Sequence, residues 1–352
     1  MKLSIITINY NNAEGLRKTL ASVAAQTYAD IEHIIVDGGS TDNSVEVIRD
    51  YSQSPIANSH EIRWISEKDK GIYNAMNKGI KIALGKRIVN DDHTSSPNSL
   101  IASSPYRLSD YIQILNSGDI LAAADVTEHM MAALAQQVRG EEHPMMQASS
   151  GTPLRLKVKG NENSVAENTA LSPNSLITSS PTENGPAIFY GNMIKVNAQG
   201  QVVGKSGYTE YSLRQFYSST LNHDCAYIRR DLFEEYGLYD ENLKIVSDWK
   251  WYLQAIGLGR VKPEYVDIDV TIFDDGGISE TNLALRNKER RQVLEELLPP
   301  AVLWDYDTHA FEMEQMNRLR RWKLYPLVYF MERVLFKLEK WGILGERLKV
   351  RG

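Results

Sequence analysis

Apolar and polar positions alternate along the first third of the chain with two different periods. Three short runs are rich in β-branched and apolar residues, as buried strands are, at positions 3–10, 31–36 and 62–66. Each run precedes a segment whose apolar residues have helical spacing, at about 13–26, 44–51 and 72–84. This alternation predicts an α/β fold, with a Rossmann-like, mostly parallel sheet, helices on both faces, and ligands at the carboxyl ends of the strands.

Two segments interrupt this pattern. Residues 96–105 read SPNSLIASSP and residues 172–181 read SPNSLITSSP, so one string recurs with a single change. Ser, Pro and Asn dominate both strings without a regular period, which is typical of loops or disorder. We interpret both as parts of insertions, at about 91–110 and 140–186, that are looped out from the fold. Removing the first insertion restores a normal distance between the preceding helix and an apolar strand at 112–115.

Composition and charge narrow the functional class. The chain has 352 residues, 42% of them hydrophobic, and a net charge of −6, which argues against a general nucleic-acid binder. Its single cysteine, Cys225, excludes an intramolecular disulfide and fits a reducing compartment. The N-terminus lacks the features of a signal peptide, and no window reaches the roughly 18 consecutive apolar residues of a membrane span. We therefore expect a cytoplasmic protein whose membrane contact, if any, is peripheral.

The C-terminal end differs from the rest in charge. Residues 318–352 contain 10 Lys and Arg against 3 Glu. Helical spacing covers 282–298 and 313–340, with a break expected at Pro326, and aromatic and aliphatic residues alternate there with basic ones. Such a helix fits an anionic bilayer, here the inner face of the cell membrane. A helix packed on the main domain or on a partner subunit would look the same, which leaves an oligomer open.

Acidic residues follow two neighbouring predicted strands. Asp37 closes the second strand, where a carboxylate can accept hydrogen bonds from a base N–H or a ribose hydroxyl. Glu67 and Asp69 follow the third strand at the same sheet edge, so a polar nucleotide-binding pocket is predicted there. Lys78 lies on a polar helix face from which it could meet a phosphate. A capped turn, a solvated charged turn and an exposed helix face are the structural alternatives.

Two further carboxylates suit catalysis. Asp119 ends the strand segment Asn116-Ser117-Gly118-Asp119, and a divalent cation shared with a diphosphate needs such an oxygen ligand on a rigid strand end. Asp248 stands where a helix would begin, beside Trp249. Aromatic rings stack on sugar faces and raise the basicity of a carboxylate by desolvation, so Asp248 is a candidate base for a sugar hydroxyl. A Ser-Gly turn and a helix N-cap would give the same two patterns.

A family resemblance is carried, in order, by the segments ITINYNN, VDGGSTDNS, SEKDKGIYNAMNKGI, LNSGD, YGN, LNHDCAYIRRDLF, GLYDENLKIVSDW and DDGGIS. Through these segments the chain resembles the bacterial family 2 glycosyltransferases with a GT-A fold, of the exopolysaccharide and O-antigen type. The resemblance covers about residues 1–280 apart from the insertions, and leaves 281–352 as a helical, basic, amphipathic extension. It implies an inverting transfer from a nucleotide-sugar donor to a hydroxyl of a glycan or polyprenyl-diphosphate-linked acceptor, in cell-surface polysaccharide synthesis. It also implies Mg²⁺ or Mn²⁺ as cofactor.

The resemblance assigns roles to individual residues. By motif, they are a nucleoside ligand at Asp37, nucleotide-pocket residues at Glu67 and Asp69, a metal ligand at Asp119, a general base at Asp248, and a neighbour of the acceptor or diphosphate at His223. Two positions depart from the common pattern. Asn116 stands where many relatives have the first Asp of a DxD motif, and Asn74 replaces the Asp of GIYDAMN.

Other functions also fit parts of the pattern. A non-catalytic sugar-nucleotide-binding protein, inactivated by its insertions, would keep the same motifs. A nucleotidyltransferase could use a similar sheet, but residues 9–14 contain no Lys or Arg for its phosphate loop. A general interaction protein would show no metal-dependent nucleotide binding.

Overall fold

The computed structural model describes residues 1–54, 60–86, 108–139, 185–197, 199–274 and 281–340. Most of each predicted insertion and the end of the DDGGIS loop lie outside these residues. The chain divides into two compact units, Met1–Arg290 and Arg291–Gly352. The division at 280 and the looped-out character of the insertions stay predictions.

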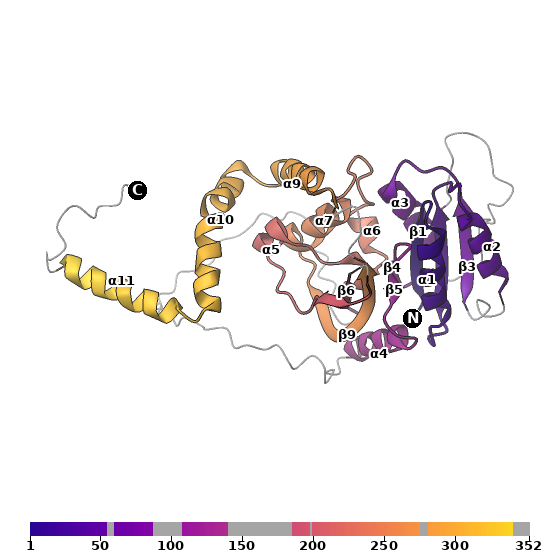
Figure 1. Cartoon of the computed structure of the whole chain (residues 1–352), viewed down its shortest axis with the longest axis horizontal. Helices are drawn as coiled ribbons and strands as arrows, with labels where there is room; N and C mark the ends of the chain where they lie inside the picture. The colour runs from indigo at the N-terminus through magenta and orange to yellow at the C-terminus, as the bar shows by residue number, and fades with distance from the viewer. Residues whose placement is uncertain (55–59, 87–107, 140–184, 198, 275–280, 341–352) are drawn as a thin grey trace, which may run out of the picture. The chain divides into compact units, whose positions relative to one another are not determined.

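A single sheet forms the centre of the first unit (Figure 1). Its first part is parallel, in the order β3 (Glu61–Ser66), β2 (Ile31–Asp37), β1 (Leu3–Asn9) and β4 (Tyr111–Ile114). Asn9 pairs with Asp37 and Asp37 with Ser66, so the carboxyl ends of three strands lie in a row. The polar residues that follow these strands therefore share one sheet edge, as the sequence predicted.

The second part of the sheet is mixed. Beyond β4 come β8 (Ala226–Arg229), β6 (Ile188–Val196), β9 (Pro263–Asp274) and β5 (Ile120–Leu121), and β7 (Val202–Lys205) pairs with β6. The β4–β8 and β8–β6 pairs are antiparallel, and β6 and β9 are parallel. The predicted α/β architecture is confirmed, with its parallel order concentrated in the first four strands.

Helices cover both faces of the parallel part. Leu16 and Leu20 of α1 (Ala13–Ala24) and Val47 and Ile48 of α2 (Ser44–Gln53) pack with Ile35 of β2. On the opposite face, Gly79 of α3 (Ile72–Ala83) lies against Ile6 of β1, so closely that an added Cβ would be 2.3 Å from its Cγ2. Successive strand residues point to opposite faces, which explains why both faces of these strands are apolar.

The remaining helices of the first unit group with the mixed part of the sheet (Figure 1). They are α4 (Val126–Val138), α5 (Leu213–Ser218), α6 (Leu232–Glu235) and α7 (Ser247–Tyr252), together with a 3₁₀ turn at His223–Cys225 and a π-helical turn at Leu253–Leu258. The start of α7 and the 3₁₀ turn carry the residues that complete the site described below.

The first insertion does not displace the strand that follows it. Tyr111 of β4 pairs with Leu3 of β1, and Ile114 pairs with Ile6. Leu115 N–H continues this alignment by donating to the carbonyl oxygen of Ile6 at 2.8 Å. The segment that leads to Asp119 is therefore held in register by the central strand.

Within residues 281–340, the structure describes three helices: α9 (Leu283–Leu297), α10 (Pro300–Arg321) and α11 (Tyr325–Lys340). The predicted break near Pro326 is confirmed, because proline is tolerated only in the first turn of a helix and α11 begins one residue before it. The predicted start of the preceding helix at 313 is wrong. Helix α10 begins at Pro300, which suits a first helical position. Within the described ranges, no helix combines the length and apolarity needed to cross a bilayer.

Candidate active site

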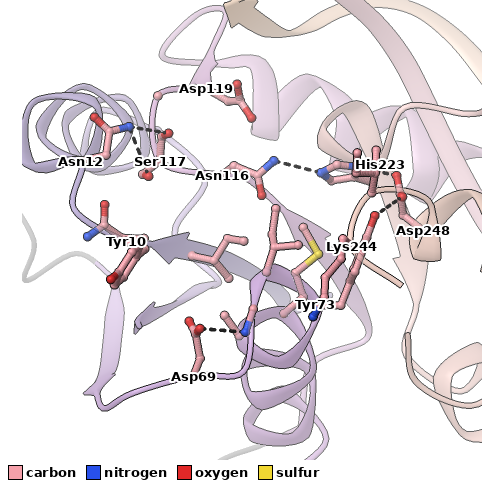
Figure 2. Close-up of a pocket in the computed structure, with 18 of the residues that line it drawn as sticks. Tyr10, Asn12, Asp69, Tyr73, Asn116, Ser117, Asp119, His223, Lys244 and Asp248 are labelled. Atoms are coloured by element: carbon pink, nitrogen blue, oxygen red, sulfur yellow. Dashed lines mark hydrogen bonds and ion pairs between the residues drawn. The ribbon is translucent and has the colours of Figure 1, made fainter. Parts of the chain in front are cut away.

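A pocket of about 680 Å³ opens at the carboxyl end of the parallel strands (Figure 2). Its volume is in the range of small-molecule sites. Polar side chains from both parts of the sheet line it, namely Tyr10, Asn12, Asp69, Tyr73, Asn116, Ser117, Asp119, His223, Lys244 and Asp248. Of the residues predicted from the sequence, Asp69, Asp119, His223 and Asp248 thus come together in one cavity, although they are far apart in the chain.

The loop that presents Asp119 is held by α1. Thr19 Oγ1 donates to the carbonyl oxygen of Asp119 at 2.7 Å and accepts from Gly118 N–H at 2.9 Å. The side chain of Asn12, which caps α1, donates to the carbonyl oxygen of Ser117 at 3.0 Å. Gly118 has φ +113°, a conformation that favours glycine. These contacts give Asp119 the rigid strand-end position that a metal ligand needs.

Asp119 is a buried carboxylate without full hydrogen bonding. It is 5% exposed, and its Oδ2 finds no hydrogen-bond partner in the described structure. Burial and the nearby carboxylate of Asp224 raise the pKa of Asp119. Asp224 is also buried, and its Oδ2 accepts from Thr271 at 2.6 Å. A bound cation would offset the cost of holding Asp119 ionised, so this residue fits a divalent metal.

Besides Asp119, the described residues offer few ligands for a metal ion at this end of the pocket. Among the described residues, no group of three or more His, Cys, Asp or Glu side chains is arranged to hold a metal ion. Mg²⁺ is often bound by one or two carboxylates together with substrate phosphates and water. The residues present therefore suit a metal that is shared with a diphosphate.

Asp248, the second residue of α7, is hydrogen-bonded through both carboxylate oxygens. Tyr73 Oη donates to Oδ1 at 2.8 Å, and His223 Nδ1 lies 3.2 Å from Oδ2 (Figure 2). Burial by itself raises the pKa of Asp248, but the hydrogen bonds and charge of His223, together with Tyr73, hold it below its ordinary value. Asp248 is therefore ionised at neutral pH. The N-cap of α7 is Val246, so Asp248 does not have that structural role.

His223 connects the two ends of the pocket. Burial lowers the pKa of His223, but the carboxylates of Asp248, Asp224 and Asp119 outweigh this and raise it to about 9. The ring is thus an imidazolium at neutral pH. Its Nε2 lies close to the side-chain amide of Asn116, which belongs to the loop of Asp119. A positive charge placed between these carboxylates suits the neighbourhood of an anionic substrate group.

The other strand-end acids differ in position. Asp69 lines the pocket, and its Oδ1 accepts from Gly71 N–H at 2.9 Å. Asp37 is fully buried and does not appear among the lining residues. Its carboxylate accepts from Asn9 Nδ2 at 2.9 Å and from Ser66 Oγ at 2.7 Å, which joins the ends of three strands. Its role as a nucleoside ligand stays a prediction.

Three other predicted site residues do not line this pocket. Lys78 Nζ pairs with Glu67 at 2.8 Å, so the two charges are engaged with each other. Trp249 is 2% exposed, its Nε1 donates to the carbonyl oxygen of Phe216 at 2.8 Å, and the guanidinium of Arg290 lies 5.0 Å from its ring. In this structure Glu67 and Lys78 stabilise a loop and Trp249 packs in the core, and their substrate contacts stay predictions.

Tyr73 and Lys244 are among the lining residues that were not recognised from the sequence. Tyr73 occupies an apolar position of α3 and looks like a core residue in the helical pattern. Lys244 lies in a segment with no recognisable secondary-structure pattern. Its amine nevertheless lies close to Gly71 of the pocket, 4.0 Å from the point where a Cβ on that glycine would be. The carboxylate of Glu289 accepts from the backbone N–H groups of Lys244 at 2.8 Å and Ile245 at 2.9 Å, which holds this segment at the pocket. Only a tertiary contact identifies either residue.

Part of the chain is similar to known glycosyltransferases. Residues 4–101 match the family model described as glycosyl transferase family 2. Two relatives that the chain resembles are uncharacterized glycosyltransferases, one from Nostoc sp. that is 36% identical over 131 residues and one from Mycobacterium tuberculosis that is 43% identical over 84 residues. These matches cover 36% and 24% of the chain, and 39% and 30% of the relatives.

One similarity extends further. A PGL/p-HBAD biosynthesis glycosyltransferase of Mycobacterium bovis is 21% identical over 279 residues, which is 79% of each chain. Among solved structures, TarS of S. aureus in complex with UDP has a TM-score of 0.49 at 15% identity, and the match covers 91% of this chain and 74% of TarS. A mannosyltransferase of Pyrobaculum calidifontis, with GDP-Man and Mn²⁺, has a TM-score of 0.45 at 13% identity and covers 81% and 60%. These structural likenesses are weak, and the fold rests on the sheet order itself.

Proposed function

We propose that this chain is an inverting glycosyltransferase of family 2. It moves a sugar from a nucleotide-sugar donor to a hydroxyl of a glycan or polyprenyl-diphosphate-linked acceptor, in cell-surface polysaccharide synthesis. The observation that carries the proposal is one pocket with two different carboxylates: Asp248, hydrogen-bonded and ionised, and Asp119, buried with an unsatisfied oxygen. Inversion in a single displacement needs a base for the acceptor and charge stabilisation for the leaving diphosphate, with no covalent enzyme nucleophile.

The proposed reaction uses these positions as follows. The acceptor hydroxyl oxygen attacks the anomeric carbon, and the bond from that carbon to the diphosphate oxygen breaks. Asp248 takes the hydroxyl proton, and the nucleoside diphosphate leaves with the electron pair. Asp119 would hold Mg²⁺ or Mn²⁺, which supplies positive charge to the diphosphate when bound. The imidazolium of His223 and the amine of Lys244 add cationic groups of the protein at the same pocket.

The alternative of a silenced sugar-nucleotide-binding protein depends on damage by the insertions. The register of β4 on β1 after the first insertion favours an active enzyme, because it keeps Asp119 at the sheet edge beside Asn12 and Thr19. Nucleotide binding without turnover of any donor, across varied acceptors, would instead support the silenced protein.

Calorimetric titration with UDP, GDP, dTDP and CMP tests the binding site. We expect one nucleotide to bind in the presence of Mn²⁺, and Asp119→Ala to weaken that binding at least about tenfold, or about 1.4 kcal/mol, because the metal loses its protein ligand. The matched control is Asp125→Ala, an exposed carboxylate six residues further on that pairs with His129. Undiminished affinity of the Asp119 variant in Mn²⁺, or equal affinity of the natural chain with and without Mn²⁺, would contradict the metal assignment. No binding of any nucleotide would contradict the function.

We also propose that α11 lies on an anionic membrane surface, which would bring the enzyme to a lipid-linked acceptor. Large apolar side chains of this helix are exposed, among them Leu327, Phe330, Met331 and Leu335. The segment around it carries the basic excess noted above, which complements anionic lipid. An oligomer interface and a cytoplasmic location without membrane contact are the alternatives.

Flotation of the full chain with vesicles separates these alternatives. We expect binding at low salt to vesicles that contain an anionic lipid, weaker binding to neutral vesicles, and loss of binding in Leu327→Glu/Phe330→Glu. Val202→Glu/Val203→Glu, two exposed apolar residues of β7, is the matched control. Unchanged flotation of the α11 variant would refute the proposal. A subunit interface would be indicated by two results together. The natural chain would not float with any vesicle, and light scattering would give the α11 variant half the particle mass of the natural chain.

A further inference from the structure

Helix α3 extends from the pocket loop that contains Asp69 toward Asp248, the proposed general base. Its first turn follows the loop of Asp69 and Gly71, both of which line the pocket. One residue into the helix, Tyr73 is 4% exposed and points its hydroxyl at Asp248, to which it donates at 2.8 Å across 175 residues of sequence. Figure 2 shows this hydrogen bond at the side of the pocket where His223 also meets Asp248.

The position of Tyr73 is fixed by a polar clamp farther along α3. Asn77 donates to the carbonyl oxygen of Tyr239 at 2.8 Å and accepts from Tyr239 N–H at 3.0 Å. Glu241 accepts from Asn77 at 2.9 Å and from Asn74 at 2.7 Å. The clamp binds α3 to the segment just before α7, so the hydroxyl of Tyr73 and the carboxylate of Asp248 are held by connected parts of the fold.

We propose that Tyr73 is a positioning residue for catalysis, whose hydroxyl fixes the carboxylate of Asp248 so that one of its oxygens faces the acceptor hydroxyl. A carboxylate has about four acceptor positions, and Tyr73 and His223 occupy one on each oxygen. The backbone N–H of Trp249 also bonds to this carboxylate, so about one position stays available to a substrate. This role rests on the proposed function, because it takes Asp248 as the general base.

Other titratable groups also face Asp248. They come from the 3₁₀ turn, the segment before α7, α7 itself and α9, and are His223, Tyr239, Tyr252 and Arg290. The hydroxyls of Tyr239 and Tyr252 find no hydrogen-bond partner in the described structure. Tyr239 is buried, and its ring centroid lies 5.8 Å from that of Tyr73. Tyr239→Phe is therefore a matched control that removes a buried hydroxyl nearby without removing a bond to Asp248.

The first measurement needs no substrate. The side-chain carboxyl carbon of Asp248 is followed by NMR through a pH titration of the full chain with ¹³C-labelled aspartate, and its signal is assigned with Asp248→Asn. Tyr73→Phe removes a donor that favours the ionised carboxylate, so the pKa of Asp248 should rise. Tyr239→Phe should leave it unchanged. An equal pKa of Asp248 in the natural chain and in Tyr73→Phe would overturn the proposal.

The second measurement is turnover, as release of nucleoside diphosphate from UDP-glucose, UDP-N-acetylglucosamine and GDP-mannose. We expect Tyr73→Phe to lower kcat about tenfold and to move the acid limb of kcat/KM to higher pH, with nucleoside diphosphate affinity unchanged. Normal kcat in Tyr73→Phe would overturn the catalytic part. A natural chain that binds nucleotide but turns over no donor would count against the proposed function instead, and the NMR titration would still decide whether Tyr73 holds Asp248.

Discussion

Asp248→Asn should abolish most of the transferase activity while leaving the nucleotide site intact. An asparagine amide keeps the shape and can still accept a hydrogen bond from Tyr73, but it cannot take the acceptor proton. Because general-base catalysis typically contributes 10²–10⁴-fold, we expect kcat to fall by about that factor. The measurement is turnover of the donor whose nucleotide binds in calorimetry, alongside the affinity for that nucleotide.

Asp231→Asn is the matched control for this variant. Its carboxylate pairs with Arg229 at 2.7 Å and does not appear among the residues that line the pocket. We expect its kcat to equal that of the natural chain. If Asp248→Asn kept more than about a tenth of the natural kcat, the proton would have to go elsewhere, and Asp248 would not be the general base.

Asn77→Ala should be among the most destabilising single changes in the first unit. Asn77 is 2% exposed, and its removal leaves the backbone N–H and carbonyl of Tyr239 without their partners. A buried polar group without a partner costs roughly 1–3 kcal/mol, so we expect the free energy of unfolding to fall by about 2–4 kcal/mol. Urea unfolding followed by circular dichroism would measure it.

Asn74→Ala is the comparison for this prediction. Asn74 is partly exposed and donates to Glu241 through its side chain. Water can replace the lost bond there, so the free energy of unfolding should fall by no more than about 1 kcal/mol. Equal losses in the two variants would mean that the clamp on Tyr239 contributes little to stability. The hydrogen bond from Asn74 to Glu241 also suits an Asn in place of the Asp of the GIYDAMN motif. An Asp at position 74 would place a second carboxylate against Glu241 and could not donate to it.

Much of the fold could be predicted because its signals are local. Strands β1 to β3 and helices α1 to α3 lie within two residues of their predicted ends, since hydrophobic period and turn residues act over a few positions. Helix α10 was placed 13 residues too late because its apolar pattern is weak. The antiparallel strands β8 and β5 were not predicted in detail, because pairing between distant segments leaves no mark in either one.

The residues of the site could likewise be predicted only in part. Asp119, Asp248 and His223 were found because motif order pointed to them, and the structure brings them to one pocket. Lys78 and Trp249 had equally suitable side chains, but one pairs with Glu67 and the other is buried under Arg290.

Sequence alone determined the α/β class, the strand ends that carry acids, and the resemblance to family 2 glycosyltransferases, because these depend on residue type and spacing along the chain. Only the tertiary structure decided which of those acids share a cavity, and that Tyr73 and Lys244 belong to it. The physical reason is that the hydrogen bond from Tyr73 to Asp248 spans 175 residues. Tyr73 and Asp248 meet only because α3 and α7 pack in the same unit, and this packing cannot be predicted from either segment by itself.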